Sequence, residues 1–167
     1  METDRRLTQL KTLLVDDDEF IRDAIALAFR QRGYPLRTEE SAEKGLKAME
    51  KESFDIIISD FRLPGLDGLE FLKAAVDLQP ASVKLLISAT GDHRTVAAAY
   101  AVGAQDFLQK PFALKTLWAT LGMHIGKKNG TNNALPLKLV SVPPARSFCK
   151  DASAGVGRAR APLVKPL

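Results

Sequence analysis

Over its first 123 residues the chain alternates short apolar runs with longer segments of helical periodicity, five times in succession. The apolar runs predict five strands, at residues 12–15, 35–38, 55–59, 83–87 and 106–109. The segments that follow them predict five helices, at residues 20–32, from 41 onward, and at 67–79, 94–102 and 112–123. Because helical crossovers between parallel strands are right-handed, this pattern predicts an α/β fold with a doubly wound parallel sheet and helices on both faces.

Local signals place the ends of these helices and their buried faces. Gly33 is expected to end the first helix and Ser41 to cap the second, and Asp67 with Glu70 is expected to form a capping box on the third. Large apolar side chains at helical spacing are predicted to lie in the core, among them Phe20, Phe29, Phe71, Leu78 and Phe112.

The net charge of +4 is unevenly distributed along the chain. Residues 1–123 hold 16 Lys and Arg against 19 Asp and Glu, a net charge of −3, whereas residues 124–167 hold eight against one, a net charge of +7. The basic balance therefore indicates no nucleic-acid surface on the part that is predicted to fold. We expect one domain over residues 10–123 and a basic, disordered tail over residues 124–167, which has five prolines and no sustained apolar periodicity.

The sequence shows neither a membrane span nor a signal peptide. No apolar segment approaches the roughly 18 residues that cross a bilayer, and none of signal-peptide length follows the N-terminus. The single cysteine, Cys149, cannot form an internal disulfide. These features predict a cytoplasmic protein.

Polar and charged residues stand directly after four of the predicted strands. They are Asp16 and Asp17 after the first strand, Asp60 after the third, Ser88 after the fourth and Lys110 after the fifth. Since the carboxyl ends of parallel strands share one edge of the sheet, these side chains are expected to converge. Each of them alone is more often a turn former, a cap or a solvated side chain, so the prediction of a site depends on their joint placement.

Three carboxylates at one edge need a cation, because two of them about 4 Å apart repel by about 4 kcal/mol at an effective dielectric near 20. An all-oxygen site with open positions suits Mg²⁺ or Mn²⁺. The metal and the Lys110 ammonium would offset the charge of a phosphoryl group, and a carboxylate can act as the nucleophile for its transfer.

Four segments resemble the bacterial response-regulator receiver family, and they occur in the family's order. They are Leu-Leu-Val-Asp16-Asp17-Asp18, Ser59-Asp60-Phe-Arg-Leu-Pro64-Gly-Leu-Asp67-Gly68, Ile87-Ser88-Ala89 and Gly103-Ala-Gln-Asp-Phe107-Leu-Gln-Lys110-Pro111-Phe112. The resemblance covers residues from about 10 to 123. It implies a five-stranded sheet of strand order 2-1-3-4-5 in a flavodoxin-like, three-layer α/β/α arrangement.

The resemblance also implies roles for the site residues. Asp60 would be the phospho-acceptor, and the Mg²⁺ ligands would be Asp16, Asp17, Asp60 and the backbone carbonyl of Arg62. Lys110 would be the catalytic lysine and would form a cis peptide bond with Pro111. Ser88 would provide the switch hydroxyl, and Phe107 would be the switch aromatic residue. Arg62 and Thr90 stand at positions that tune the lifetime of the phosphoryl group in receivers.

Such a protein is a response regulator of a two-component phosphorelay, not an enzyme apart from its self-catalysed phosphotransfer and dephosphorylation. It would receive its phosphoryl group from a sensor histidine kinase or a phosphotransfer protein. Phosphorylation would switch the surface of the fourth helix, fifth strand and fifth helix for partner binding or homodimer formation. The output stays open, because the tail is shorter than common output domains, and nucleic-acid binding by the tail has no support in the sequence.

Two other functions fit part of the pattern. A haloacid-dehalogenase-type aspartyl phosphatase would use Asp16 and Asp18, but it needs further acids after the lysine, and the only acid past Lys110 is Asp151. A degenerate receiver would bind proteins without phosphorylation, but such a domain usually lacks Asp60 or the acidic pair.

Overall fold

The structure is a computed structural model that describes residues 7–127. Its strands are β1 (Thr12–Val15), β2 (Leu36–Glu39), β3 (Ile56–Asp60), β4 (Val83–Ser88) and β5 (Asp106–Gln109). Its long helices are α2 (Glu19–Gln31), α3 (Ala42–Lys51), α4 (Gly68–Leu78), α5 (His93–Ala101) and α6 (Leu114–Lys127). The predicted tail from residue 128 onward, with Cys149, lies outside the described residues.

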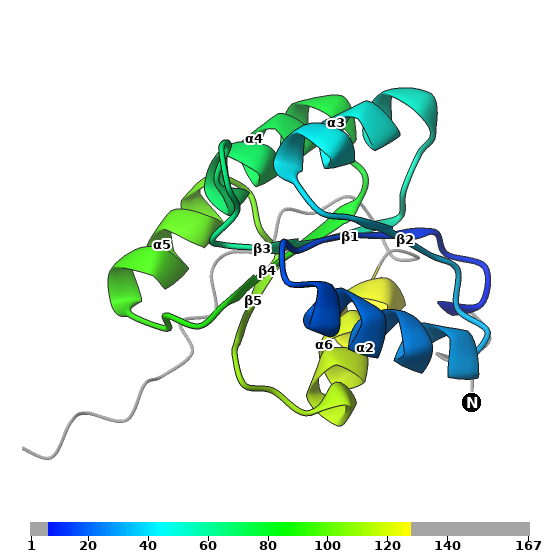
Figure 1. The fold of residues 1–167 in the computed structure, drawn as a ribbon. Helices are drawn as coiled ribbons and strands as arrows, with labels where there is room; N and C mark the ends of the chain where they lie inside the picture. The colour runs from blue at the N-terminus through cyan, green and yellow to red at the C-terminus, as the bar shows by residue number, and fades with distance from the viewer. Residues whose placement is uncertain (1–6, 128–167) are drawn as a thin grey trace, which may run out of the picture. The chain divides into compact units, whose positions relative to one another are not determined.

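The five strands form one parallel sheet in the order β2-β1-β3-β4-β5, which confirms the predicted fold class and strand order. Helices α3, α4 and α5 cover one face of the sheet, and α2 and α6 cover the other (Figure 1). The central strand β3 is buried along its whole length, as expected for a strand covered on both faces.

Two hydrophobic clusters lie on opposite faces of the sheet. Because side chains alternate along a strand, Ile57 packs under α3 and α4 while its neighbours Ile56 and Ile58 pack under α2 and α6. Phe71 is the largest fully buried side chain of the first cluster and Phe29 that of the second. The continuous apolar runs in the sequence are thus explained by a core on each side of the sheet.

The predicted helix ends are confirmed. The side chain of Ser41 accepts the backbone N–H of Lys44, and Asp67 and Glu70 form the capping box of α4. Gly33 follows α2 with a φ of +68°, the left-handed conformation that commonly ends a helix.

The prediction of a buried position is wrong for two residues. Phe20 is 86% exposed, because it lies in the first turn of α2 on the face opposite Ile25 and Phe29. Leu78 is 50% exposed at the end of α4, where the neighbouring Gln79 turns inward instead and hydrogen-bonds the backbone of α3 and of the loop before β3.

The last helix also differs from its predicted range of 112–123. Phe112 precedes α6 and packs, partly buried, against the core. The helix continues to Lys127, since its buried face repeats at Leu117, Leu121 and Ile125.

A buried lysine of β4 hydrogen-bonds the segment that follows α4. Lys84, in the middle of the sheet, is 1% exposed, and its Nζ donates to the carbonyl oxygens of Gln79 at 2.6 Å and Ser82 at 3.0 Å. Both carbonyls lie in the segment that follows α4, and they provide hydrogen-bond acceptors for the buried ammonium.

Candidate functional site

The register of the sheet brings the ends of four strands to the same level. Val15 of β1 pairs with Ser59 of β3, and Ser88 of β4 pairs with Gln109 of β5. The residues that follow these positions, Asp16, Asp60 and Lys110, therefore meet at one edge.

The ammonium of Lys110 lies between two carboxylates. Its Nζ is 2.8 Å from Oδ2 of Asp16 and 2.7 Å from Oδ1 of Asp60. The side chain of Asp16 is fully buried, that of Asp60 is 8% exposed and that of Lys110 is 18% exposed. Two negative charges and one positive charge thus share a site that largely excludes water, where electrostatic interactions are stronger than at the surface.

The surroundings shift the pKa values of two of these groups. Burial raises the pKa of Asp16 above its ordinary value of 3.8, because the hydrogen bonds from Lys110 and from the backbone of Asp18 offset only part of the desolvation. Burial opposes the charge of Lys110, but its hydrogen bonds to Asp16 and Asp60 outweigh that effect, and its pKa lies above 10.5. The contribution of Lys110 to folding stability is therefore present below pH 10.5 and is lost as the pH rises through its folded pKa.

Backbone groups fix the orientation of both carboxylates. The N–H of Arg62 donates to Oδ2 of Asp60 at 2.9 Å, and the N–H of Asp18 donates to Oδ1 of Asp16 at 3.0 Å. Arg22 of α2 donates from Nη1 to the backbone oxygen of Asp16 at 2.7 Å, a role that the sequence did not indicate. Both oxygens of each carboxylate are therefore engaged by the protein.

Ser88 and Phe107 lie on the strands next to this cluster. Ser88 is buried at the end of β4, and its Oγ accepts the backbone N–H of Thr90 at 3.0 Å. Phe107 of β5 is partly buried against the core on the α3–α5 face. The peptide bond between Lys110 and Pro111 is cis, as predicted.

The other two acids of the first loop point elsewhere. Asp17 is exposed and does not belong to the contacts around Lys110. Asp18 caps α2, and its Oδ1 accepts the N–H groups of Phe20 and Ile21. Within residues 7–127, no three His, Cys, Asp or Glu side chains form a ready metal cluster. Asp16 and Asp60 nevertheless offer the oxygen ligands that Mg²⁺ prefers, and the Lys110 ammonium lies beside them.

A glycine behind Asp60 makes this arrangement possible. A Cβ at Gly68, the first residue of α4, would overlap the backbone carbonyl oxygen of Asp60. The N–H of Gly68 donates to the carbonyl of Phe61 at 3.0 Å, so the loop after β3 folds back tightly on the strand end. The sequence places Gly68 in the predicted helix of residues 67–79 and does not indicate this close approach to Asp60.

The substitution Asp16→Asn is expected to stabilise the protein at pH 7, because it removes a desolvated charge and leaves the Lys110 ammonium paired with Asp60. Because folding raises the pKa of Asp16, its ionised form opposes folding; this cost is absent below pH 3.8 and fully present above the folded pKa. Thermal unfolding of both proteins between pH 4 and 8 measures the difference, which should shrink toward about pH 4. A less stable Asp16→Asn protein at pH 7 would contradict this account.

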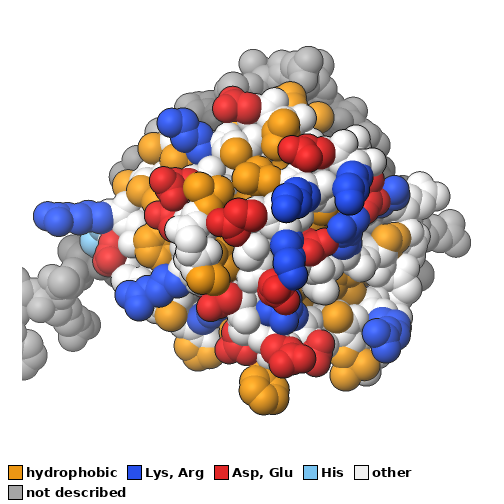
Figure 2. All heavy atoms as spheres, turned by 45° about the horizontal axis from the view of Figure 1, so that its top comes forward, with side chains coloured by type: hydrophobic (Ala, Val, Ile, Leu, Met, Phe, Trp, Pro, Cys, Tyr) orange, Lys and Arg blue, Asp and Glu red, His pale blue; other side chains and the backbone are white. Residues whose placement is uncertain are grey.

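On the face shown in Figure 2, basic and acidic side chains are interspersed. Among the helices of residues 7–127, none combines the length and the apolar character that a membrane span requires.

Comparison with known proteins identifies the family. Residues 12–122 match the family model of the response regulator receiver domain. The transcriptional activator protein PfeR of Pseudomonas aeruginosa is 36% identical over 107 residues, which cover 64% of this chain and 35% of PfeR. The chain spans about a third of the length of PfeR and of another curated relative, the response regulator protein FleR of Pseudomonas aeruginosa.

Solved structures agree with this assignment. A CheY-like receiver domain protein from Methanospirillum hungatei JF-1 superposes with a TM-score of 0.69 and 26% identity, over 72% of this chain and 97% of that one. A response regulator protein from Burkholderia pseudomallei, with a phosphorylated aspartic acid, a calcium ion and citrate, gives a TM-score of 0.65 and 27% identity, over 72% and 71%. With a family model that matches well over half of its length, this chain belongs to the response regulator receiver domain family, which serves phosphorylation-based two-component signalling.

Proposed function

We propose that this protein accepts a phosphoryl group on Asp60 and uses Asp16, Asp17, Asp60 and the backbone carbonyl of Arg62 to hold Mg²⁺ or Mn²⁺. The single observation that carries the proposal is the Lys110 ammonium held between Asp16 and Asp60 at the carboxyl edge of the sheet. A phosphorylated aspartate and a divalent cation in the related Burkholderia structure support it.

When bound, the metal would neutralise charge on the phosphoryl oxygens and help to orient them. The protein's own residues provide the rest of the chemistry. A carboxylate oxygen of Asp60 forms the new bond to phosphorus in line with the departing group, which leaves with the electron pair of the broken bond. Lys110 is placed to stabilise the negative charge of the transferred group, since its ammonium already contacts the acceptor.

Ser88 is suited to contact the transferred group. Its Oγ now accepts the N–H of Thr90, which leaves the hydroxyl proton free to donate to a phosphoryl oxygen. A movement of Ser88 toward Asp60 would release space beside β4 and β5, and Phe107 would turn further inward to fill it. Arg62 and Thr90 border the same site and would tune the lifetime of the phosphoryl group.

The switched surface would be that of α5, β5 and α6, and polar contacts already join these three elements. His124 of α6 lies 2.8 Å from Oδ2 of Asp106 on β5, and Tyr100 on α5 lies near the same carboxylate. Burial and the nearby Asp106 carboxylate raise the pKa of Tyr100. The backbone N–H of Phe107 donates to Oδ1 of Asp106 at 2.8 Å, which links the backbone of the proposed switch residue to this carboxylate.

This surface would control partner binding or a homodimer. Moving a two-state switch from 1:99 to 99:1 requires about 5.5 kcal/mol, which a dianionic group in contact with a metal, Lys110 and Ser88 can supply. The phosphoryl donor would be a sensor histidine kinase or a phosphotransfer protein in the cytoplasm. We assign the receiver domain to residues 10–123, with α6 continuing to Lys127, and regard residues after it as a tail outside the switch.

The test is the intact mass of the protein after incubation with acetyl phosphate and Mg²⁺. We expect a gain of one phosphoryl group that is absent with a chelator, and peptide mapping after borohydride reduction should place it on Asp60. An adduct on Asp16, or one that forms equally well in chelator, would contradict the proposal.

The substitution Lys110→Gln is expected to slow phosphorylation by acetyl phosphate by about 100-fold or more, because a preorganised cation is lost where negative charge develops. Glutamine is one atom shorter than lysine, but it keeps an uncharged hydrogen-bond donor group at the end of its side chain. The matched control is Lys115→Gln, an exposed lysine on α6 that does not contact the site. Equal rates for the two variants would exclude an electrostatic role for Lys110.

A further inference from the structure

The outer face of α2 carries an exposed apolar stripe. Phe20 is 86% exposed, Leu27 is 52% exposed, and Ala24 lies exposed between them at helical spacing. Single exposed apolar residues are common, but a contiguous stripe marks an interaction surface. The inner face of the helix is already packed through Ile25 and Phe29, so the stripe is a second, separate apolar face.

Charged residues lie beside this stripe, in an order that would pair opposite charges if two copies of α2 packed antiparallel. Glu19 and Asp23 lie exposed in the N-terminal half of α2, and Arg30 lies exposed in its C-terminal half. Asp23 and Arg30 are seven residues apart and therefore lie on the same flank, about 10 Å from each other along the axis. The other basic residue of the helix, Arg22, is directed at the backbone of Asp16 and is not part of this flank.

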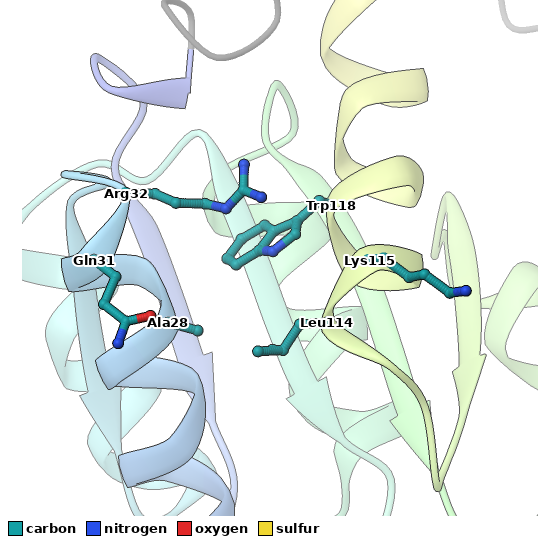
Figure 3. A pocket seen from close by; sticks show the side chains of 6 residues that line it. All are labelled: Ala28, Gln31, Arg32, Leu114, Lys115 and Trp118. Carbon is teal, nitrogen blue, oxygen red and sulfur yellow. The ribbon is translucent and has the colours of Figure 1, made fainter.

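A pocket lies beside the C-terminal end of the same helix. It has a volume of about 480 Å³ and is lined by Ala28, Gln31, Arg32, Leu114, Lys115 and Trp118. In Figure 3, Trp118 and Leu114 of α6 point toward α2, and Arg32 reaches across the indole ring. The guanidinium carbon of Arg32 is 5.0 Å from the ring centre. The pocket thus presents the apolar side chains of Ala28, Leu114 and Trp118, and it is large enough for an aromatic side chain.

We propose that the protein associates with a second copy of itself through an antiparallel, two-fold packing of α2 against α2. A two-fold axis near Leu27 places Asp23 of each copy opposite Arg30 of the other, on the same flank of the interface. The two Leu27 side chains then meet at the axis. With the two helices aligned in this way, Phe20 of each copy lies opposite the residues just after Gln31 of the other copy. The pocket beside Trp118 lies there.

Apart from the pocket that α6 helps to line, this interface is separate from the surface of α5, β5 and α6, and it does not depend on phosphorylation. It uses charges and apolar groups that are exposed in the structure as it stands. Association through α2 is therefore expected in the unmodified full chain and in Asp60→Asn alike. Failure of phosphorylation on Asp60 would leave this prediction unchanged, so the two proposals are tested separately.

The test is sedimentation velocity of the full chain over a roughly hundredfold range of concentration. We expect a monomer–dimer equilibrium whose dissociation constant rises at least about tenfold in Asp23→Arg, because the two-fold axis repeats each repulsion. Arg30→Asp should have a similar effect. The double variant D23R/R30D, in which the charges are exchanged, should return to within about threefold of the wild type.

Matched controls separate this interface from general effects of charge and hydrophobicity. Lys47→Glu reverses an exposed charge on α3, and Leu78→Ser removes a half-exposed leucine from α4; neither should change the association. Phe20→Ser should weaken it at least about tenfold. All of these positions are exposed, and circular dichroism verifies the fold.

Three results would overturn the proposal. The first is a wild type that stays monomeric throughout. The second is a dimer that does not respond to Asp23→Arg, or one that D23R/R30D does not restore. The third is a monomeric protein in which Phe20→Ser slows phosphoryl transfer from a histidine phosphotransfer domain, since the stripe would then bind that partner.

Discussion

The substitution Asp60→Asn is expected to abolish phosphorylation, with less than about 1% of the wild-type rate from acetyl phosphate in Mg²⁺. The amide retains an oxygen that can accept the N–H of Arg62, so the loop should keep its shape. The amide has no negative charge with which to bind a metal, and it is a poor nucleophile. The time course of the mass increase of 80 Da per phosphoryl group, about one for each chain in the wild type, provides the measurement.

The control for Asp60→Asn is Asp77→Asn, an exposed aspartate on α4 far along the helix from its capping box. It should be phosphorylated at the wild-type rate. A phosphoryl adduct that persists in Asp60→Asn would mean that another acid is the acceptor. Asp16 would then be the first to map, because it shares Lys110 with Asp60.

The substitution Gly68→Ala is expected to destabilise the protein by about 3 kcal/mol and to impair phosphorylation as well. The new methyl group would overlap the carbonyl oxygen of Asp60 and crowd the backbone of Phe61, and no flexible side chain is present to yield. The end of β3 must move, and the carboxylate of Asp60 moves with it. Urea unfolding and the acetyl phosphate assay on the same preparation measure the two effects.

Gly33→Ala is the matched control for Gly68→Ala. A Cβ at Gly33 meets no atom within 4 Å, but its φ of +68° disfavours alanine, so we expect a cost of about 1 kcal/mol. Phosphorylation should be unaffected, since Gly33 lies at the far end of α2 from Asp16. If Gly68→Ala were no more destabilising than Gly33→Ala, the tight packing behind Asp60 would not matter for folding.

Much of the fold was predictable because its signals are local. The run Ile56–Ile58 indicates a strand buried on both faces, and residues such as Ser41 and Asp67 cap the helices that follow them. The errors also have a common cause. Phe20 and Leu78 are apolar residues in amphipathic helices, and the sequence does not reveal whether the first or last turn still faces the sheet.

The site was predictable only in part. The placement of Asp16, Asp60 and Lys110 after separate strands predicts that they meet, because parallel strands end at one edge. Their detailed contacts are non-local: Lys110 lies 94 residues from Asp16 in the chain, yet its ammonium contacts that side chain. The outward direction of Asp17 and the support that Arg22 gives to Asp16 likewise follow from how α2 leaves β1.

The sequence by itself determined the order of strands and helices, the edge of the sheet where chemistry is concentrated and the residue types available there. The tertiary structure alone decided which acids share Lys110, why Gly68 has no room for a side chain, and that Lys84 is buried at the end of α4. The physical reason is distance along the chain. Periodicity and capping act over a few residues, whereas ion pairing, desolvation and steric fit depend on groups that only folding brings together.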